Sequence, residues 1–211
     1  MRPTVWLNCA ASLDGKLAAP DRSPMVFSDD ADWHRVHRMR SEVDAILVGV
    51  GTILADNPSL TIKDAFAPVS PTRHLLRVIL DSKGRTPKNA RAVDGYKPSL
   101  IVTAPGVQAK WAKAQHATVP LGADGHLDLG ALLNLLYERG VRRLLVEGGS
   151  TVLRSFLDTD YVDRWTLYVA PVLVGGNGPS LFDGRPSSIG RRLHVENVQA
   201  AGKGALWTFR P

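Results

Sequence analysis

Two stretches of the chain place polar groups directly after an apolar run that is typical of a buried strand. They are residues 48–52 (Val-Gly-Val-Gly-Thr) and residues 145–151 (Leu-Val-Glu-Gly-Gly-Ser-Thr). Main-chain N–H groups at a helix N-terminus bind phosphate, and glycine lets a ligand approach them closely. The second stretch therefore predicts a pyrophosphate site, with Glu147 facing the crevice in which α/β sheets bind ligands.

Both stretches also have a purely structural explanation. Glycines are common at a strand-to-helix turn for steric reasons alone. Glu147 could likewise be an acidic residue in a loop, followed by a helix whose first residues are capped in the usual way. Neither stretch is the dinucleotide fingerprint of a Rossmann fold, because Leu54 occupies the place of the third glycine after residue 49. Any nucleotide must therefore bind in a different geometry.

Three other polar segments, residues 11–16, 55–63 and 170–176, are compatible with ordinary turns. The sequence contains no Walker A loop, no nucleophile elbow, no zinc-binding His pair and no zinc deaminase signature. Cys9 is the single cysteine, so it cannot form an intrachain disulfide, and we expect it to be buried. We accordingly predict no metal site.

The elements that must position these segments alternate between strand and helix. Apolar runs predict strands at 5–10, 45–49, 77–81, 99–103, 143–147, 164–174 and 205–210. Helical spacing predicts helices at 29–42, 52–55, 131–139 and 150–157, and one around Trp111. This order indicates an α/β fold with a mostly parallel central sheet flanked by helices. The last two strands have no clear helix between them and predict an antiparallel C-terminal edge.

Bulk properties narrow the function. A chain of 211 residues with 44% apolar residues fits a single domain over 1–211. The net charge of +6 is diffuse, which favours a small ligand with several phosphates over nucleic acid. No stretch approaches the roughly 18 apolar residues of a membrane span, and the first residues lack the apolar core of a signal peptide. We expect a cytoplasmic protein without a membrane partner.

Six segments, taken in order, resemble the riboflavin-biosynthesis reductases, which comprise the C-terminal domain of the bacterial bifunctional deaminase-reductase and stand-alone archaeal and fungal enzymes. They are 12–16 (Ser-Leu-Asp-Gly-Lys), 35–40 (Arg-Val-His-Arg-Met-Arg), 49–58 (Gly-Val-Gly-Thr-Ile-Leu-Ala-Asp-Asn-Pro), 60–61 (Leu-Thr), 147–149 (Glu-Gly-Gly) and 170–171 (Ala-Pro). The likeness covers residues 5–184 and looks closest to the archaeal type. It implies a dihydrofolate reductase-like fold, NADPH as cofactor and a homodimer.

The resemblance also assigns roles residue by residue. The positions that match NADPH contacts are Ala10, Val26, Gly51, Thr52, Asp56, Ser82, Gly148, Gly149, Ser150 and Thr151. The positions that match substrate contacts are Ser23, Arg40, Leu60, Lys63 and Glu147, with Arg40 holding the ribose phosphate. Lys63 stands where the bacterial enzymes have arginine, so it supplies charge without a bidentate fork.

The implied reaction moves a hydride from the nicotinamide to C1′ of an opened ribosylamine, which leaves a ribitylamine. The substrate is 2,5-diamino-6-ribosylamino-4(3H)-pyrimidinone 5′-phosphate or its deaminated counterpart, 5-amino-6-(5-phosphoribosylamino)uracil, and the sequence does not distinguish the two. Glu147, Asp56 and Lys63 are candidates for proton transfer, as is a bound water, and we expect Glu147 mainly to orient the substrate. Residues 82–85 (Ser-Lys-Gly-Arg) form either a site for the 2′-phosphate of NADPH or a solvated turn.

Two other functions stay open. A pterin or dihydrofolate reductase of the same fold would keep the cofactor, but a pterin lacks a phosphate and would leave Arg40 and Lys63 without a ligand. A non-catalytic NADP-binding regulatory module would need a degenerate substrate crevice, whereas Glu147, Arg40 and Asp56 are all in place.

Overall fold

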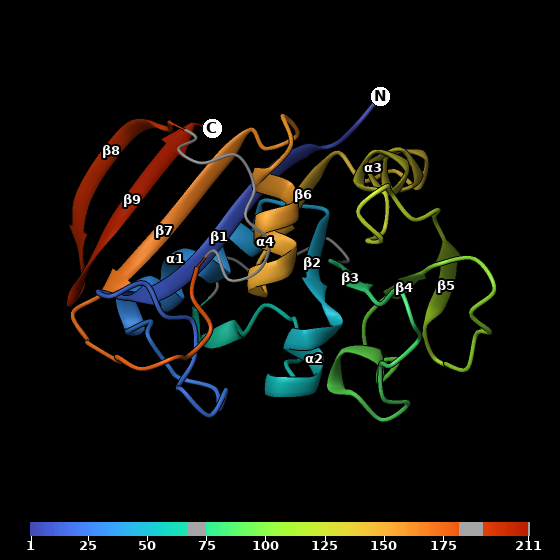
Figure 1. Ribbon diagram of the computed structural model, residues 1–211, viewed down its shortest axis with the longest axis horizontal. Coiled ribbons are helices and arrows are strands. Elements are labelled where there is room, and N and C mark those ends of the chain that lie inside the picture. Colours follow the sequence, from blue (N-terminus) through green and yellow to red (C-terminus); the bar gives the residue numbers. More distant parts are fainter. Residues whose placement is uncertain (67–74, 182–191, 211) are drawn as a thin grey trace.

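A computed structural model describes residues 1–66, 75–181 and 192–210 (Figure 1). A nine-stranded sheet in the order β5-β4-β3-β2-β6-β1-β7-β9-β8 forms its centre. The strands are β1 (Thr4–Ser12), β2 (Ala45–Gly49), β3 (Leu76–Leu80), β4 (Ser99–Thr103), β5 (Gln115–Thr118), β6 (Arg143–Val146), β7 (Arg164–Ala170), β8 (His194–Ala201) and β9 (Gly204–Arg210). All neighbours from β5 to β7 are parallel, whereas the β7–β9 and β9–β8 pairs are antiparallel. The predicted α/β class and antiparallel C-terminal edge are confirmed.

Helices cover both faces of the sheet. They are α1 (Asp30–Ser41), α2 (Val50–Asp56), α3 (Leu129–Glu138) and α4 (Ser150–Leu157), with the 3-10 turns η1 (Asp64–Phe66) and η2 (Arg91–Val93). The apolar sides of α3 and α4 pack on one face, and those of α1 and η2 pack on the other. Figure 1 shows α4 in front of the sheet and α1 behind it. None of the described helices is both long and apolar enough to cross a bilayer.

The strand order brings two strand ends together where the chain can bind a ligand. Strand β6 lies between β1 and β2, with Leu144 in register with both Val5 and Ala45. Beyond the last paired residues, the Glu147 N–H donates to the Leu47 carbonyl and the Gly49 N–H donates to the Gly148 carbonyl, each at 3.0 Å. Helices α2 and α4 therefore start side by side at the carboxyl ends of neighbouring strands, which is the usual ligand site of such sheets.

The helix starts differ in how their main-chain N–H groups are satisfied. The side chains of Asp29 and Asp128 cap α1 and α3, and each accepts from the N–H of the residue three positions later, as capping aspartates do. In contrast, α2 and α4 begin after Gly49 and Gly149 with no side-chain cap. Their first N–H groups are therefore left for another acceptor.

Three predictions about elements are wrong or incomplete. Trp111 does not lie on a helix; it is buried in an irregular segment, where its indole N–H donates to the Thr86 carbonyl at 2.9 Å. Strand β7 ends at Ala170, before Pro171, because proline has no N–H to continue the ladder. The edge strands β5 and β8 were not predicted, since neither shows an alternating or continuous apolar pattern.

Candidate functional site

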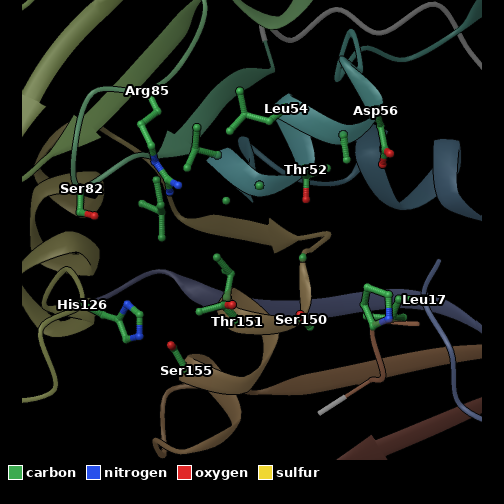
Figure 2. Close-up of a pocket in the computed structure, with 18 of the residues that line it drawn as sticks. Leu17, Thr52, Leu54, Asp56, Ser82, Arg85, His126, Ser150, Thr151 and Ser155 are labelled. Carbon is green, nitrogen blue, oxygen red and sulfur yellow. The ribbon is translucent and has the colours of Figure 1, made fainter. Parts of the chain in front are cut away.

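A cleft of about 890 Å³ lies at the carboxyl ends of β2, β3 and β6 (Figure 2). Seven of the ten residues predicted to bind the cofactor or its phosphates line it, namely Gly51, Thr52, Asp56, Ser82, Gly149, Ser150 and Thr151. Figure 2 shows Thr52 from α2 and Ser150 and Thr151 from α4 around a common space. The uncapped helix starts thus open into a single cleft together with the hydroxyl groups of their first turns.

Two glycines keep the floor of this cleft open. A Cβ at Gly51 would meet nothing within 4 Å, so the space above it is free. A Cβ at Gly149 would lie 3.4 Å from the Thr52 hydroxyl oxygen, so the two helix starts almost touch. The backbone of Gly148 has a φ of 140°, a conformation that only glycine adopts readily. The Gly-Gly pair therefore lets the chain turn sharply from β6 into α4 and leaves the start of α4 without a side-chain cap.

A rigid turn after β3 carries the cationic wall of the cleft. The buried carboxylate of Asp81 accepts from the Thr86 N–H and the Thr86 hydroxyl, at 2.6 and 2.7 Å. Within this closed turn, Lys83 and Arg85 line the cleft, and Figure 2 shows the Arg85 side chain reaching into it. The other carboxylate oxygen of Asp81 lies 4.0 Å from Arg85 Nε, so a long ion pair holds Arg85 beside the cleft while 55% of its side chain stays exposed to an anionic ligand.

Two loops that are paired with each other form the opposite wall. The Leu13 N–H donates to Val172 O and the Leu17 N–H donates to Pro179 O, both at 2.8 Å. The exposed carboxylate of Asp14 accepts from the Ser12 hydroxyl and from the N–H groups of residues 174 and 175, and these bonds hold its pKa well below the usual range. Asp14 thereby fastens the loop after β1 to the loop after β7. Leu17, Ala18 and Pro179 carry this pair of loops into the cleft wall.

Asp56 is the acidic side chain among the described cleft residues. It lies at the end of α2, and desolvation beside the cleft raises the pKa of its carboxyl even though the residue remains exposed. Figure 2 shows it on the same side as Thr52. A carboxyl with a raised pKa gives up or takes a proton nearer to neutral pH than an ordinary aspartate.

Four of the five residues predicted to bind the substrate, Arg40, Leu60, Lys63 and Glu147, form a second group next to the cleft. Arg40 and Glu147 face each other in a bidentate ion pair, Nε to Oε1 at 2.8 Å and Nη2 to Oε2 at 2.6 Å. Both side chains are largely buried, with 11% and 9% exposure. Glu147 directly precedes the Gly-Gly turn, so the pair is linked to the cleft through the chain. Each residue was predicted to contact the substrate, whereas their pairing with each other was not predicted.

Leu60 and Lys63 lie on a segment that buried side chains hold in place. Leu60 is buried with a φ of 53°, a left-handed conformation that is uncommon for a residue of its kind. The Thr61 carbonyl accepts from Arg40 Nη1 at 2.8 Å, and the Lys63 N–H donates to Nδ1 of His37 at 3.2 Å. Such a backbone conformation persists only where its surroundings impose it.

The other predicted site residues lie outside the cleft lining. Ala10 packs on the third apolar cluster of the sheet, under the β7–β9 edge. Val26 is 80% exposed, and Ser23 is exposed in a turn where its N–H donates to Asp21. Their neighbours Arg22, Pro24 and Met25 do line the cleft. Gly148 adjoins the lining without being part of it.

Sequence reasoning missed three residues that organise the site, which are Asp14, His37 and Arg77. Asp14 was interpreted as a turn residue, and its partners lie 160 positions away, beyond any local pattern. Arg77 occurs inside an apolar strand, and an arginine in such a run is a signal that could have been used, because buried arginines are always paired. His37 carries no such signal on a helix.

Comparison with known proteins agrees with this geometry. The family model described as the RibD C-terminal domain matches residues 3–207. The chain is 36% identical to the 2,5-diamino-6-ribosylamino-4(3H)-pyrimidinone 5′-phosphate reductase of Archaeoglobus fulgidus, over 100% of this chain and 99% of that protein. It is 39% identical to the protein of the same description from Methanothermobacter thermautotrophicus, over 87% of this chain and 85% of that one.

A solved structure shows the same fold. The bifunctional diaminohydroxyphosphoribosylaminopyrimidine deaminase/5-amino-6-(5-phosphoribosylamino)uracil reductase of Thermotoga maritima superimposes with a TM-score of 0.83 at 31% identity. The match covers 100% of this chain and 57% of the Thermotoga chain. The chain therefore spans nearly the whole of its archaeal relatives but little more than half of the bifunctional protein.

Proposed function

The chain belongs to the RibD C-terminal domain family, the reductases of riboflavin biosynthesis, and we propose that it reduces a ribosylaminopyrimidine 5′-phosphate to the ribitylamino form with NADPH. Its fold is of the expected dihydrofolate reductase-like type. The observation that carries the proposal is the cleft in which two uncapped helix starts meet two cations, next to the buried Arg40–Glu147 pair. The homodimer and the cytoplasmic location stay predictions.

The cleft suits a nicotinamide dinucleotide. The free N–H groups at the start of α4 and the open space above Gly51 fit a pyrophosphate, which helix starts bind well. Lys83 and Arg85 offer charge to the additional phosphate that distinguishes NADPH from NADH. The loops fastened by Asp14 wall off the other side and limit the access of water to the reacting atoms.

The bound cofactor supplies a hydride, so the residues of the chain have to bind, orient and protonate. Both Glu147 oxygens accept from Arg40, which fixes the plane of the guanidinium and leaves further N–H groups on Nη1 and Nη2 for the substrate phosphate. Glu147 is thus an orienting residue. Asp56, with its raised pKa and its place in the cleft, is the better placed carboxyl to protonate the substrate nitrogen.

The direct test is NADPH oxidation at 340 nm with the diamino ribosylaminopyrimidinone phosphate and its deaminated analogue offered in parallel. We expect turnover of at least one of them, and the ratio of the two kcat/KM values defines whether deamination precedes reduction. Dihydrofolate serves as the control substrate. No turnover of either pyrimidine, together with turnover of dihydrofolate or with NADPH binding alone, would refute the proposal in favour of a pterin reductase or a regulatory module.

The preference for NADPH gives a second prediction. The double substitution Lys83→Ala and Arg85→Ala should lower the ratio of kcat/KM with NADPH to kcat/KM with NADH by about tenfold to a hundredfold. Both cations are exposed to water, so losing the two together should cost about as much as one hydrogen bond to a charged group, about 1.5–3 kcal/mol. Lys113→Ala with Arg139→Ala changes the net charge equally at exposed positions outside the cleft and should leave the ratio unchanged. An unaltered ratio in the Lys83→Ala and Arg85→Ala variant would show that these two cations do not bind the 2′-phosphate of NADPH.

A further inference from the structure

The segment that carries Leu60 and Lys63 is held at three alternating main-chain positions. The Ser59 carbonyl accepts from Arg77 Nη1 at 3.2 Å, and the Thr61 carbonyl accepts from Arg40 Nη1 at 2.8 Å. The third position is the Lys63 N–H, which donates to His37 Nδ1 at 3.2 Å. His37 and Arg40 are three residues apart on α1 and so lie on one helix face. The two side chains therefore bind main-chain groups that lie two residues apart in the same segment, the Thr61 carbonyl and the Lys63 N–H.

His37 is built into this position. Its side chain is fully buried, and the ring of Phe66 stacks on it with centroids 5.2 Å apart and an angle of 10° between the planes. Trp33 contacts it from the preceding turn of the helix. Because Nδ1 accepts from Lys63, the ring proton resides on Nε2, which has no hydrogen-bond partner among the described residues. Burying a polar ring is unfavourable unless the ring is hydrogen-bonded. The bond to the Lys63 N–H is therefore what makes this position of His37 favourable.

Charge balance shows why the placement of Lys63 is important. The positive charge of Arg40 is matched by Glu147 in a bidentate pair, so the pair together brings little net charge to a phosphate. In the described part of the chain, no carboxylate pairs with the Lys63 ammonium, which lies 5.9 Å from the centre of the Trp33 ring. A dianionic phosphate bound at Arg40 therefore needs Lys63 as its second cation.

We propose that His37 is a positioning residue for the substrate phosphate, acting through the main chain of Lys63. This inference rests on the proposed function, because the phosphate belongs to the proposed substrate. Without the bond to His37, the end of the segment loses one of its three anchors. The Lys63 side chain then samples a wider range of positions, and phosphate binding weakens while hydride transfer is untouched.

The protonation state of His37 agrees with this role. Burial, followed by the charges of Arg40, Lys63 and His34, lowers the pKa of the ring from 6.5 to about 4. Arg40 and His34 face it from α1, Lys63 faces it from the held segment, and Glu147 lies behind Arg40. The ring is therefore neutral at pH 7 and accepts the Lys63 N–H. Protonation in acid places a hydrogen on Nδ1 and abolishes the bond.

The test compares two polar replacements that differ in where they place an acceptor. In His37→Asn the amide oxygen takes the place of Nδ1, whereas in His37→Gln it reaches the place of Nε2 and leaves the Lys63 N–H unpaired. We expect His37→Gln to raise KM for the pyrimidine phosphate about tenfold, the equivalent of one hydrogen bond of about 1.4 kcal/mol. KM for NADPH and kcat should change little. His37→Asn should stay within about threefold of the wild type in KM.

Two further readouts separate positioning from a structural role. The Lys63 amide should exchange its hydrogen faster in His37→Gln than in the wild type or in His37→Asn. Between pH 6 and pH 4, KM of the wild type relative to that of His37→Asn should rise as the wild-type ring becomes protonated. His194→Asn, the same replacement at an exposed histidine on the edge strand β8, serves as the control and should match the wild type in all three measurements.

The outcomes distinguish the two levels of the proposal. A wild-type protein that turns over neither pyrimidine fails as the proposed reductase, and amide exchange at Lys63 then still reports on the hydrogen bond. A wild-type protein that is active, with equal KM values for His37→Gln and His37→Asn or with kcat lowered instead of KM raised, overturns the positioning role alone.

Discussion

Replacing Arg40 with methionine is expected to lower kcat/KM for the phosphorylated pyrimidine by about thirtyfold to five-thousandfold, because truncating one partner of a buried charge pair costs about 2–5 kcal/mol. Three effects act together in this variant. The phosphate loses a cation, the Glu147 carboxylate stays buried at 9% exposure without its partner, and the Thr61 carbonyl loses its donor. Steady-state kinetics with saturating NADPH measures the loss.

A second substitution separates binding from stability. Arg40→Met alone should lower the free energy of unfolding by about 3–5 kcal/mol, since it leaves an unpaired buried charge. Adding Glu147→Gln removes that charge, so the double variant should regain much of the stability in urea unfolding but none of the kcat/KM. Recovery of activity in the double variant would contradict a role of Arg40 in phosphate binding. Glu147→Gln alone should alter KM, and no change in either KM or kcat would refute the orienting role of Glu147.

The second large effect is expected at Arg77, whose side chain is fully buried inside β3. Its guanidinium lies within hydrogen-bond distance of the main-chain carbonyls of Ser59, Arg91 and Lys97 and of the side chains of Asp94 and Ser99. Each buried carbonyl left without a donor costs about 1–3 kcal/mol. Arg77→Met should therefore lower the free energy of unfolding by about 3–5 kcal/mol, as measured by urea unfolding.

Arg91 provides the matched control for this prediction. Its carbonyl is held by Arg77, but its own side chain is exposed, so Arg91→Met should stay within about 0.5 kcal/mol of the wild type. Arg77→Met should also raise KM for the pyrimidine phosphate, because the Ser59 carbonyl loses its anchor in the segment that carries Lys63. An equal stability of the two variants would show that the bonds of Arg77 only replace those that water makes in the unfolded chain.

Two strands buried on both faces, Ala45–Gly49 and Ser99–Thr103, have the bounds that their apolar runs predicted. The strands predicted at 77–81 and 143–147 exist but are observed at Leu76–Leu80 and Arg143–Val146. Helix Ser150–Leu157 was equally clear because a Gly-Gly pair precedes it. The exposed edge strand β8 was not predictable, since its residues pair with β9 through the backbone and their side chains carry no pattern. The helix predicted around Trp111 is absent because this residue packs against the turn at Thr86, and in the sequence such a residue looks the same as one on a helix face.

The candidate site was predictable where glycine turns follow buried strands, and it was not predictable where distant side chains pair. Thr52 and Gly149 lie in one cleft because β2 and β6 are neighbours, which the alternating pattern allows but does not specify. The pairing of Arg40 with Glu147 joins positions 107 residues apart. No local rule predicts such a pair, and the same holds for the hydrogen bond between His37 and Lys63. The sequence indicated which residues could bind a ligand or transfer a proton, whereas the partners of these residues became known only from the fold.

The position of β1 in the sheet has a consequence for how the protein is made. Strand β1 pairs with β6 on one side and with β7 on the other, and Thr4 is in register with Arg143. At ordinary rates of translation, roughly ten seconds pass between the synthesis of these partners. Until β6 and β7 have been made, Val5 and Leu7 have no neighbouring strand. The middle of the sheet therefore forms from contacts that are distant in the sequence, which slows folding and lengthens the time for which the apolar strand β1 is exposed to aggregation.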